Sequence, residues 1–117
     1  MASQITIFHN PACGTSRNVL AALKARGESP KVVEYLKAGW AEAQLKELFA
    51  KMGVTPRQAM RTRGTPAEEL GLTDPKASDA AILKAMAAHP ILVERPIVVT
   101  PKGAAIVRPA EKLDALL

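Results

Sequence analysis

The chain has 117 residues, of which 48% are hydrophobic and 23% are charged, so its composition is that of a folded domain and not of a disordered segment. This length predicts a single domain over residues 1–117, and the 3% aromatic content predicts an aliphatic core. The formal net charge of +5 indicates anionic partners. A nucleic-acid-binding module is disfavoured, because the chain has no dense Lys/Arg run and few aromatic side chains for base stacking.

Cysteine usage and hydropathy exclude several further classes. Cys13 is the only cysteine, so an internal disulfide is impossible, and zinc sites need several Cys or His ligands. We therefore expect no metal and no bound cofactor. No apolar run approaches the ~18 residues of a membrane span. The N-terminus also lacks a basic and then apolar leader. We expect a cytoplasmic protein without a membrane partner.

The first part of the chain predicts a strand–helix–strand unit. The strands are expected over residues 5–8 and 32–35. The helix between them is expected from about Ser16 to Arg26, with Ser16 or Thr15 as its capping residue and Gly27 after its end. The crossover should be right-handed.

The middle of the chain predicts helices, and the end predicts a hairpin and a helix. Helices are expected over residues 41–52, from Pro56 through Arg61, and over 79–88, with further turns over 66–70. An antiparallel hairpin follows over residues 97–107, turning at 101–103, and a final helix over 109–117.

This order predicts an α/β, thioredoxin-like fold. A mixed four-stranded sheet flanked by helices would carry a helical insert between the βαβ half and the hairpin–helix half. Pro96 enters the hairpin and would face the cysteine, as a cis proline does in that fold, although sequence leaves its isomer open.

The segment His9–Arg17 carries the candidate chemistry. A lone cysteine is usually a small buried hydrophobe, but Cys13 lies in a turn that opens a helix. Free backbone N–H groups at such a place lower a thiol's pKa and hold an anion beside it, which assigns oxyanion binding to Gly14, Thr15 and Ser16. We therefore interpret Cys13 as a nucleophile that acts on an oxyanion. His9 would assist by a positive charge or by a hydrogen bond.

Arginines supply the expected counter-charge. The planar guanidinium suits tetrahedral oxyanions, and several that converge would bind a multiply charged anion. For any single arginine, a solvated surface charge is the more common role. The candidates are Arg17, Arg61, Arg95 and Arg108, whereas Arg57 and Arg63 are assigned to the solvent side.

The motifs together resemble a known family. Residues 9–18 (HNPACGTSRN), 89–92 (HPIL), 95–101 (RPIVVTP) and 108–109 (RP) are similar to those of the glutaredoxin-coupled arsenate reductases. The resemblance implies catalysis by Cys13 assisted by His9, with arsenate held by Arg61, Arg95 and Arg108. It also implies glutathione as reducing co-substrate, glutaredoxin as partner, phosphate or sulfate as substrate mimics, and a role in arsenic detoxification. The sequence around Arg61 matches less well, so Arg63 remains its competitor.

Two alternatives share the fold. One is a regulatory or binding protein, although such relatives commonly use a Cys-x-x-Cys switch and this chain has Ser16 at the second position. The other is a thiol-dependent reductase with a different acceptor.

Overall fold

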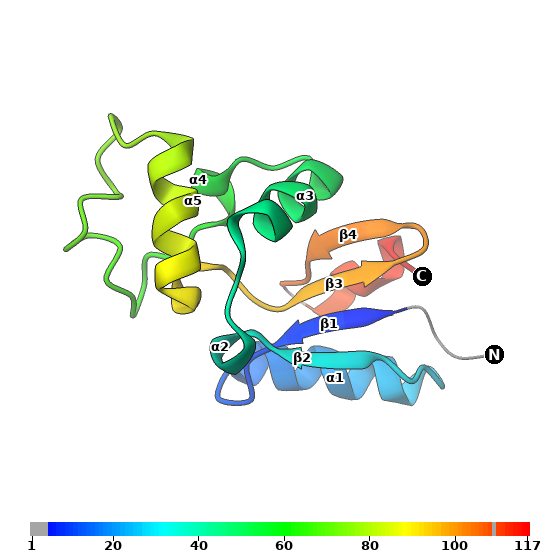
Figure 1. Ribbon diagram of the computed structural model, residues 1–117. Helices are drawn as coiled ribbons and strands as arrows, with labels where there is room; N and C mark the ends of the chain where they lie inside the picture. The colour runs from blue at the N-terminus through cyan, green and yellow to red at the C-terminus, as the bar shows by residue number, and fades with distance from the viewer. Residues whose placement is uncertain (1–4, 109) are drawn as a thin grey trace. The chain divides into compact units, whose positions relative to one another are not determined.

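The computed structural model describes residues 5–108 and 110–117 (Figure 1). The chain divides into two compact units, which we call the sheet unit (residues 1–38 and 95–117) and the insert unit (residues 39–94). The insert unit corresponds to the predicted helical insert. That the whole chain acts as one domain stays a prediction.

The sheet unit contains a mixed four-stranded sheet in the order β2-β1-β3-β4. Its strands are β1 (Thr6–His9), β2 (Lys31–Glu34), β3 (Ile97–Thr100) and β4 (Gly103–Ile106). β1 pairs in parallel with β2, and β3 is antiparallel to both β1 and β4. Phe8 pairs with Ile97, and Ile97 pairs with Ile106. This register brings the end of β1, the start of β3 and the end of β4 to one edge of the sheet.

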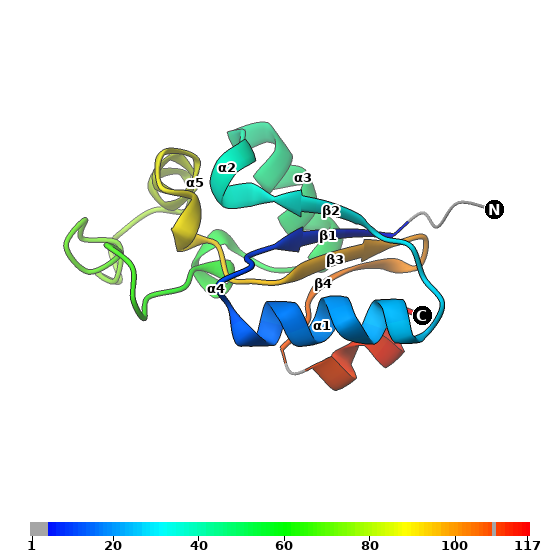
Figure 2. The ribbon, with the colours of Figure 1, turned by 90° about the horizontal axis from the view of Figure 1, so that it is seen from below.

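One face of the sheet is covered by α1 (Gly14–Ala25) and by the 3-10 helix η2 (Ala110–Ala115) (Figure 2). Alternate residues of β1 point to this face, and Val19 and Leu23 on α1 are one turn apart, so both elements present an apolar side to the same space. The core cluster is aliphatic throughout, as the composition predicts. It consists of Ile5, Ile7, Val19, Leu23, Val98, Val107, Leu113 and Leu116.

The predicted thioredoxin-like fold with a mixed four-stranded sheet is confirmed, with shifts at the ends of elements. α1 begins at Gly14, earlier than predicted, because a turn before Cys13 already starts the helix. β2 ends at Glu34, and an unpredicted short helix, α2 (Tyr35–Ala38), follows it. The predicted final helix is present as the 3-10 helix η2, over Ala110–Ala115. Pro109, with which that prediction began, lies outside the described residues.

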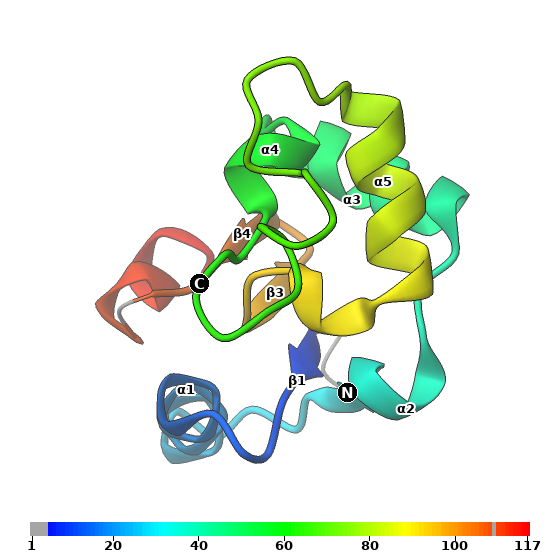
Figure 3. The ribbon, with the colours of Figure 1, turned by 90° about the vertical axis from the view of Figure 1, so that its left-hand side faces the viewer.

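The insert unit contains α3 (Glu42–Met52), α4 (Pro56–Ala59), α5 (Asp79–Ala88) and the 3-10 helix η1 (Pro90–Leu92). Helix α5 packs against α3, α4 and η1 (Figure 3). Thr55 and Ser78 cap α4 and α5 through their hydroxyl oxygens.

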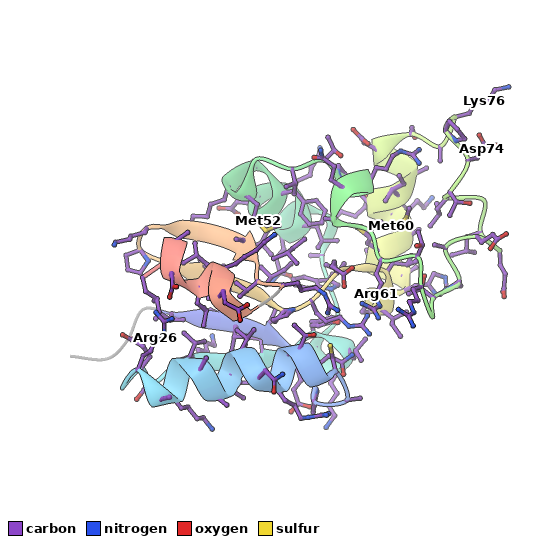
Figure 4. All side chains as sticks on the ribbon, turned by 180° about the vertical axis from the view of Figure 1, so that it is seen from behind. Arg26, Met52, Met60, Arg61, Asp74 and Lys76 are labelled. Atoms are coloured by element: carbon purple, nitrogen blue, oxygen red, sulfur yellow. The ribbon has the colours of Figure 1, made fainter. Side chains whose placement is uncertain are left out.

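The prediction that α4 extends to Arg61 is wrong. Met60 leaves the helix and forms an isolated β-bridge with Val93. The backbone N–H of Arg61 donates to the Leu92 carbonyl oxygen at 2.7 Å, so its hydrogen bond crosses to another segment and does not close a helical turn. Figure 4 shows Met60 and Arg61 at the start of an irregular segment whose far end carries Asp74 and Lys76.

The assignment of Arg57 to the solvent side is also wrong. Its side chain is half-buried, and Nη2 donates to the carbonyl oxygens of Asp74 at 3.0 Å and Ala77 at 2.8 Å. Nη1 lies 3.4 Å from the carbonyl oxygen of Leu72. The backbone carbonyls of an irregular segment have no partners in a helix or a sheet. The Arg57 guanidinium supplies donors for three of them.

Candidate active site

The turn that carries Cys13 is built around Asn10. The Asn10 carbonyl oxygen accepts a hydrogen bond from the Cys13 N–H at 3.0 Å. Its side-chain Oδ1 accepts from the Ala12 N–H at 3.0 Å, and its own N–H donates to Ser16 Oγ at 3.1 Å. Asn10 is 4% exposed, so these three bonds fix the turn from inside. Sequence reasoning assigned Asn10 no role, although an Asn-Pro pair after a strand is a signal for turn initiation.

Cys13 itself is the N-cap residue of α1, with an extended backbone at φ −93° and ψ 121°. The prediction that Ser16 or Thr15 caps the helix is therefore wrong, and the Ser16 hydroxyl serves Asn10 instead. Within residues 5–108 and 110–117, the structure gives no acceptor for the backbone N–H groups of Gly14 and Thr15. These amides belong to the first turn of α1, where N–H groups suit an anion.

The environment of Cys13 lowers the pKa of its thiol. Burial alone would raise the pKa, but hydrogen bonds from the Ser16 backbone N–H and from the Arg95 and Arg108 side chains outweigh it. The positive charge of Arg95 acts in the same direction. The thiol is half-buried and free, and the lowered pKa favours its thiolate form.

Arg95, before β3, and Arg108, after β4, converge on the sulfur. Arg108 Nη1 lies 3.7 Å from Cys13 Sγ and donates to the Arg95 carbonyl oxygen at 3.0 Å. Arg95 is 9% exposed, and the bond between Arg95 and Pro96 is cis. The N–H of Val107 donates to the Pro96 carbonyl oxygen at 2.9 Å, which ties the two arginine-bearing segments together. The structure therefore brings together Cys13, Arg95 and Arg108, three of the predicted residues.

His9 is buried at the end of β1, and its Nδ1 lies 2.6 Å from Ser16 Oγ. Ser16 Oγ also accepts from the Asn10 N–H. In its bond with His9, the Ser16 O–H donates when Nδ1 carries no proton, and Ser16 Oγ accepts when Nδ1 is protonated.

Burial lowers the pKa of His9, the nearby charge of Glu34 raises it, and the charges of Arg17 and Lys24 lower it further. Of the two assistance modes expected for His9, the lowered pKa favours hydrogen bonding over a positive charge. Its part in catalysis stays a prediction.

Arg17 lies at the surface of the same turn. Its Nη1 donates to the Pro11 carbonyl oxygen at 2.8 Å, so the side chain folds back over the loop before Cys13. The structure records no ion pair for Arg17 in the part of the chain that it describes.

Arg61 belongs to the insert unit, where its side chain has two partners. Nη1 lies 2.9 Å from Glu94 Oε1, and Nε donates to the Arg63 carbonyl oxygen at 3.1 Å. Its side chain is 19% exposed and that of Glu94 is 24% exposed, whereas Arg63 is exposed. Figure 4 labels Arg61 beside Met60, at the base of the irregular segment. That Arg61 binds the oxyanion stays a prediction.

The structure also bears on metal sites and membrane spans. Among the described residues, no group of three or more His, Cys, Asp or Glu side chains could hold a metal ion. No helix in the described part of the chain is long and apolar enough to span a membrane.

The fold and this turn define a thioredoxin-like α/β protein with a single reactive cysteine flanked by two arginines. Residues 8–116 match the model of the ArsC family, to which this chain belongs. An arsenate reductase from Synechocystis is 53% identical over 115 residues, which cover 98% of this chain and 80% of that protein. One from Escherichia coli is 46% identical, with 98% and 82% covered. The structure of an arsenate reductase from Vibrio cholerae superposes with a TM-score of 0.94 at 40% identity, covering all of both chains.

Proposed function

We propose that this protein reduces arsenate to arsenite through the Cys13 thiolate, with glutathione and glutaredoxin as the reducing system. The observation that carries the proposal is the approach of the Arg108 guanidinium to Cys13 Sγ at 3.7 Å, with Arg95 also hydrogen-bonding to the sulfur. Two guanidinium groups at a thiolate stabilise a multiply charged oxyanion next to a nucleophile. The relatives at 46% and 53% identity are named arsenate reductases, which supports arsenate as that oxyanion.

In the first step the Cys13 thiolate attacks arsenic. A sulfur–arsenic bond forms and an arsenic–oxygen bond breaks, and the oxygen leaves as water after taking up protons. Arg95 and Arg108 bind the remaining oxygens, and the Gly14 and Thr15 backbone N–H groups donate to the same anion. Arg61 is the proposed third arginine.

In the second step a glutathione thiolate attacks the Cys13 sulfur. A disulfide between Cys13 and glutathione forms, the sulfur–arsenic bond breaks, and its electron pair stays on arsenic, which leaves as arsenite. The two thiols lose two electrons and arsenic gains two. Because Cys13 is the only cysteine of the chain, an external thiol must resolve the disulfide, and glutaredoxin would do so.

Substitution of Cys13 by Ser tests this proposal. We expect arsenate-dependent NADPH oxidation, coupled through glutathione, glutathione reductase and glutaredoxin, to be abolished, because a serine hydroxyl is not ionised at neutral pH. We also expect iodoacetamide alkylation of the unsubstituted protein to have a pH midpoint below the ~8.5 of a free thiol. Full turnover by Cys13→Ser would contradict the proposal.

The acceptor is tested in the same assay. We expect turnover with arsenate and competitive inhibition by phosphate, which shares its shape and charge. Turnover with a disulfide substrate but not with arsenate would instead favour a thiol-dependent reductase of another acceptor. Absence of turnover with either would favour a regulatory or binding protein.

A further inference from the structure

Asn10 holds the Cys13 turn through hydrogen bonds to three of its residues. Its carbonyl and its Oδ1 accept the N–H groups of Cys13 and Ala12, at 3.0 Å each. These two amides are therefore turned into the loop and are not available to an anion. The next two amides, those of Gly14 and Thr15, have no acceptor among the described residues.

The third bond of Asn10 fixes the next amide along the chain. The Asn10 N–H donates to Ser16 Oγ at 3.1 Å, and the Ser16 backbone N–H hydrogen-bonds to the Cys13 sulfur. Asn10 thus divides the backbone N–H groups of the turn into three sets. Those of Ala12 and Cys13 close the loop, those of Gly14 and Thr15 stay open, and that of Ser16 faces the sulfur.

We propose that Asn10 is a positioning residue that determines which backbone N–H groups of the Cys13 turn face the reacting oxyanion. It touches neither the sulfur nor the anion and acts through the turn that it holds. The inference rests on the proposed function only for the identity of the anion as arsenate.

The choice of an amide over a carboxylate supports this role. Asn and Asp both accept a hydrogen bond from the amide two residues on, so either would close the turn. A carboxylate at this buried position would place a negative charge near a thiolate and a bound anion, which Coulomb repulsion disfavours. A neutral acceptor closes the turn without opposing the positive charges of Arg95 and Arg108.

The test compares Asn10→Ala, Asn10→Ser and the matched control Asn18→Ala. Asn18 is an exposed asparagine on α1, outside the turn. Alanine removes the bond from Oδ1, whereas a serine hydroxyl makes the same bond more weakly. Two probes need no turnover of arsenate: the pH midpoint of Cys13 alkylation by iodoacetamide, and the inorganic phosphate concentration that protects Cys13 from alkylation.

We expect Asn10→Ala to raise the pH midpoint and to weaken phosphate protection by roughly two- to tenfold, the range expected for one lost hydrogen bond. Asn10→Ser should fall between Asn10→Ala and Asn18→Ala, and Asn18→Ala should equal the unsubstituted protein. In the arsenate assay, Asn10→Ala should raise KM more than it lowers kcat. A merely structural role would lower the melting temperature and leave the alkylation of the folded protein unchanged.

Equal phosphate protection in Asn10→Ala and Asn18→Ala would overturn the inference. If Asn10→Ala does not fold, Asn10→Ser replaces it in the test. Phosphate protection of Cys13 in Asn10→Ser equal to that in Asn18→Ala would then overturn the inference. Because phosphate and iodoacetamide report on the turn directly, altered protection together with no arsenate turnover by the unsubstituted protein would contradict the proposed function and leave this inference standing.

Discussion

The Cys13 turn and the segment around Arg61 hold their candidate functional side chains in opposite ways. In the turn, the polar bonds are local: His9 contacts Ser16 over a sequence separation of 7 residues, and Asn10 contacts Ser16 over 6. Arg61 instead depends on a distant part of the insert unit, because its ion pair with Glu94 spans 33 residues and its backbone N–H bonds to Leu92.

This difference determines what a substitution does in each place. A local turn closes by itself once its residues are present, so a change within it acts on the few bonds of that turn. A guanidinium held by a remote carboxylate depends on the packing of both segments, so its position responds to changes at either end. We therefore expect the strongest effects on activity from substitutions of Arg95 and Arg108, which contact Cys13 in the local turn.

The largest effect after loss of Cys13 is expected for Arg95→Lys. Lysine keeps the charge but lacks the planar set of donors, so the substitution removes a charge-assisted hydrogen bond to the sulfur or the anion. Such bonds contribute about 1.5–3 kcal/mol, and we expect kcat/KM for arsenate to fall by about tenfold or more.

A matched control is Arg26→Lys, near the end of α1, where the arginine pairs with Asp114 at the surface. This control should keep its arsenate kinetics. If Arg95→Lys matches Arg26→Lys in kcat/KM, Arg95 does not contact the substrate.

A smaller effect is expected for Arg61→Lys. Arg61 uses Nη1 for Glu94 and Nε for the Arg63 carbonyl oxygen, and a lysine cannot make both bonds in the same geometry. We expect the arsenate KM to rise about three- to tenfold, and Arg63→Lys, at an exposed position, to leave it unchanged. Steady-state kinetics of the two variants decide which arginine serves the anion, and a larger effect of Arg63→Lys would transfer the role to that residue.

The contrast between the two regions also explains what sequence alone predicts. The βαβ unit, the hairpin and the position of Cys13 at a helix start follow from local patterns, and all three are present in the structure. The register of β3 and β4 then brings Arg95, which precedes β3, and Arg108, which follows β4, to the sulfur.

The wrong predictions concern residues whose conformation depends on a partner that is distant in the sequence. Sequence extends α4 through Arg61, but the bridge between Met60 and Val93 ends the helix at Ala59. An arginine such as Arg57 is usually expected at the surface. The carbonyl oxygens that it binds, however, come from a segment more than ten residues away. No local pattern contains either partner.

The smallest effect is expected for His9→Asn, which separates charge from hydrogen bonding. An asparagine carbonyl can accept the Ser16 O–H in place of Nδ1 but cannot carry a positive charge. Burial lowers the pKa of His9 and so disfavours protonation of the ring. We therefore expect the pH midpoint of Cys13 alkylation to change little, whereas Ser16→Ala, which removes the hydroxyl, should raise it.

The lowered pKa of His9 also determines how the stability of the protein depends on pH. A histidine with a lowered pKa in the folded protein binds its proton first in the unfolded chain, so the free energy of unfolding falls as pH drops through about 6.5. His9→Asn should lose this part of the acid sensitivity, which urea unfolding at pH 8 and pH 5 would measure. A rise in the alkylation midpoint of His9→Asn as large as that of Ser16→Ala would show instead that His9 acts on the thiolate as a cation.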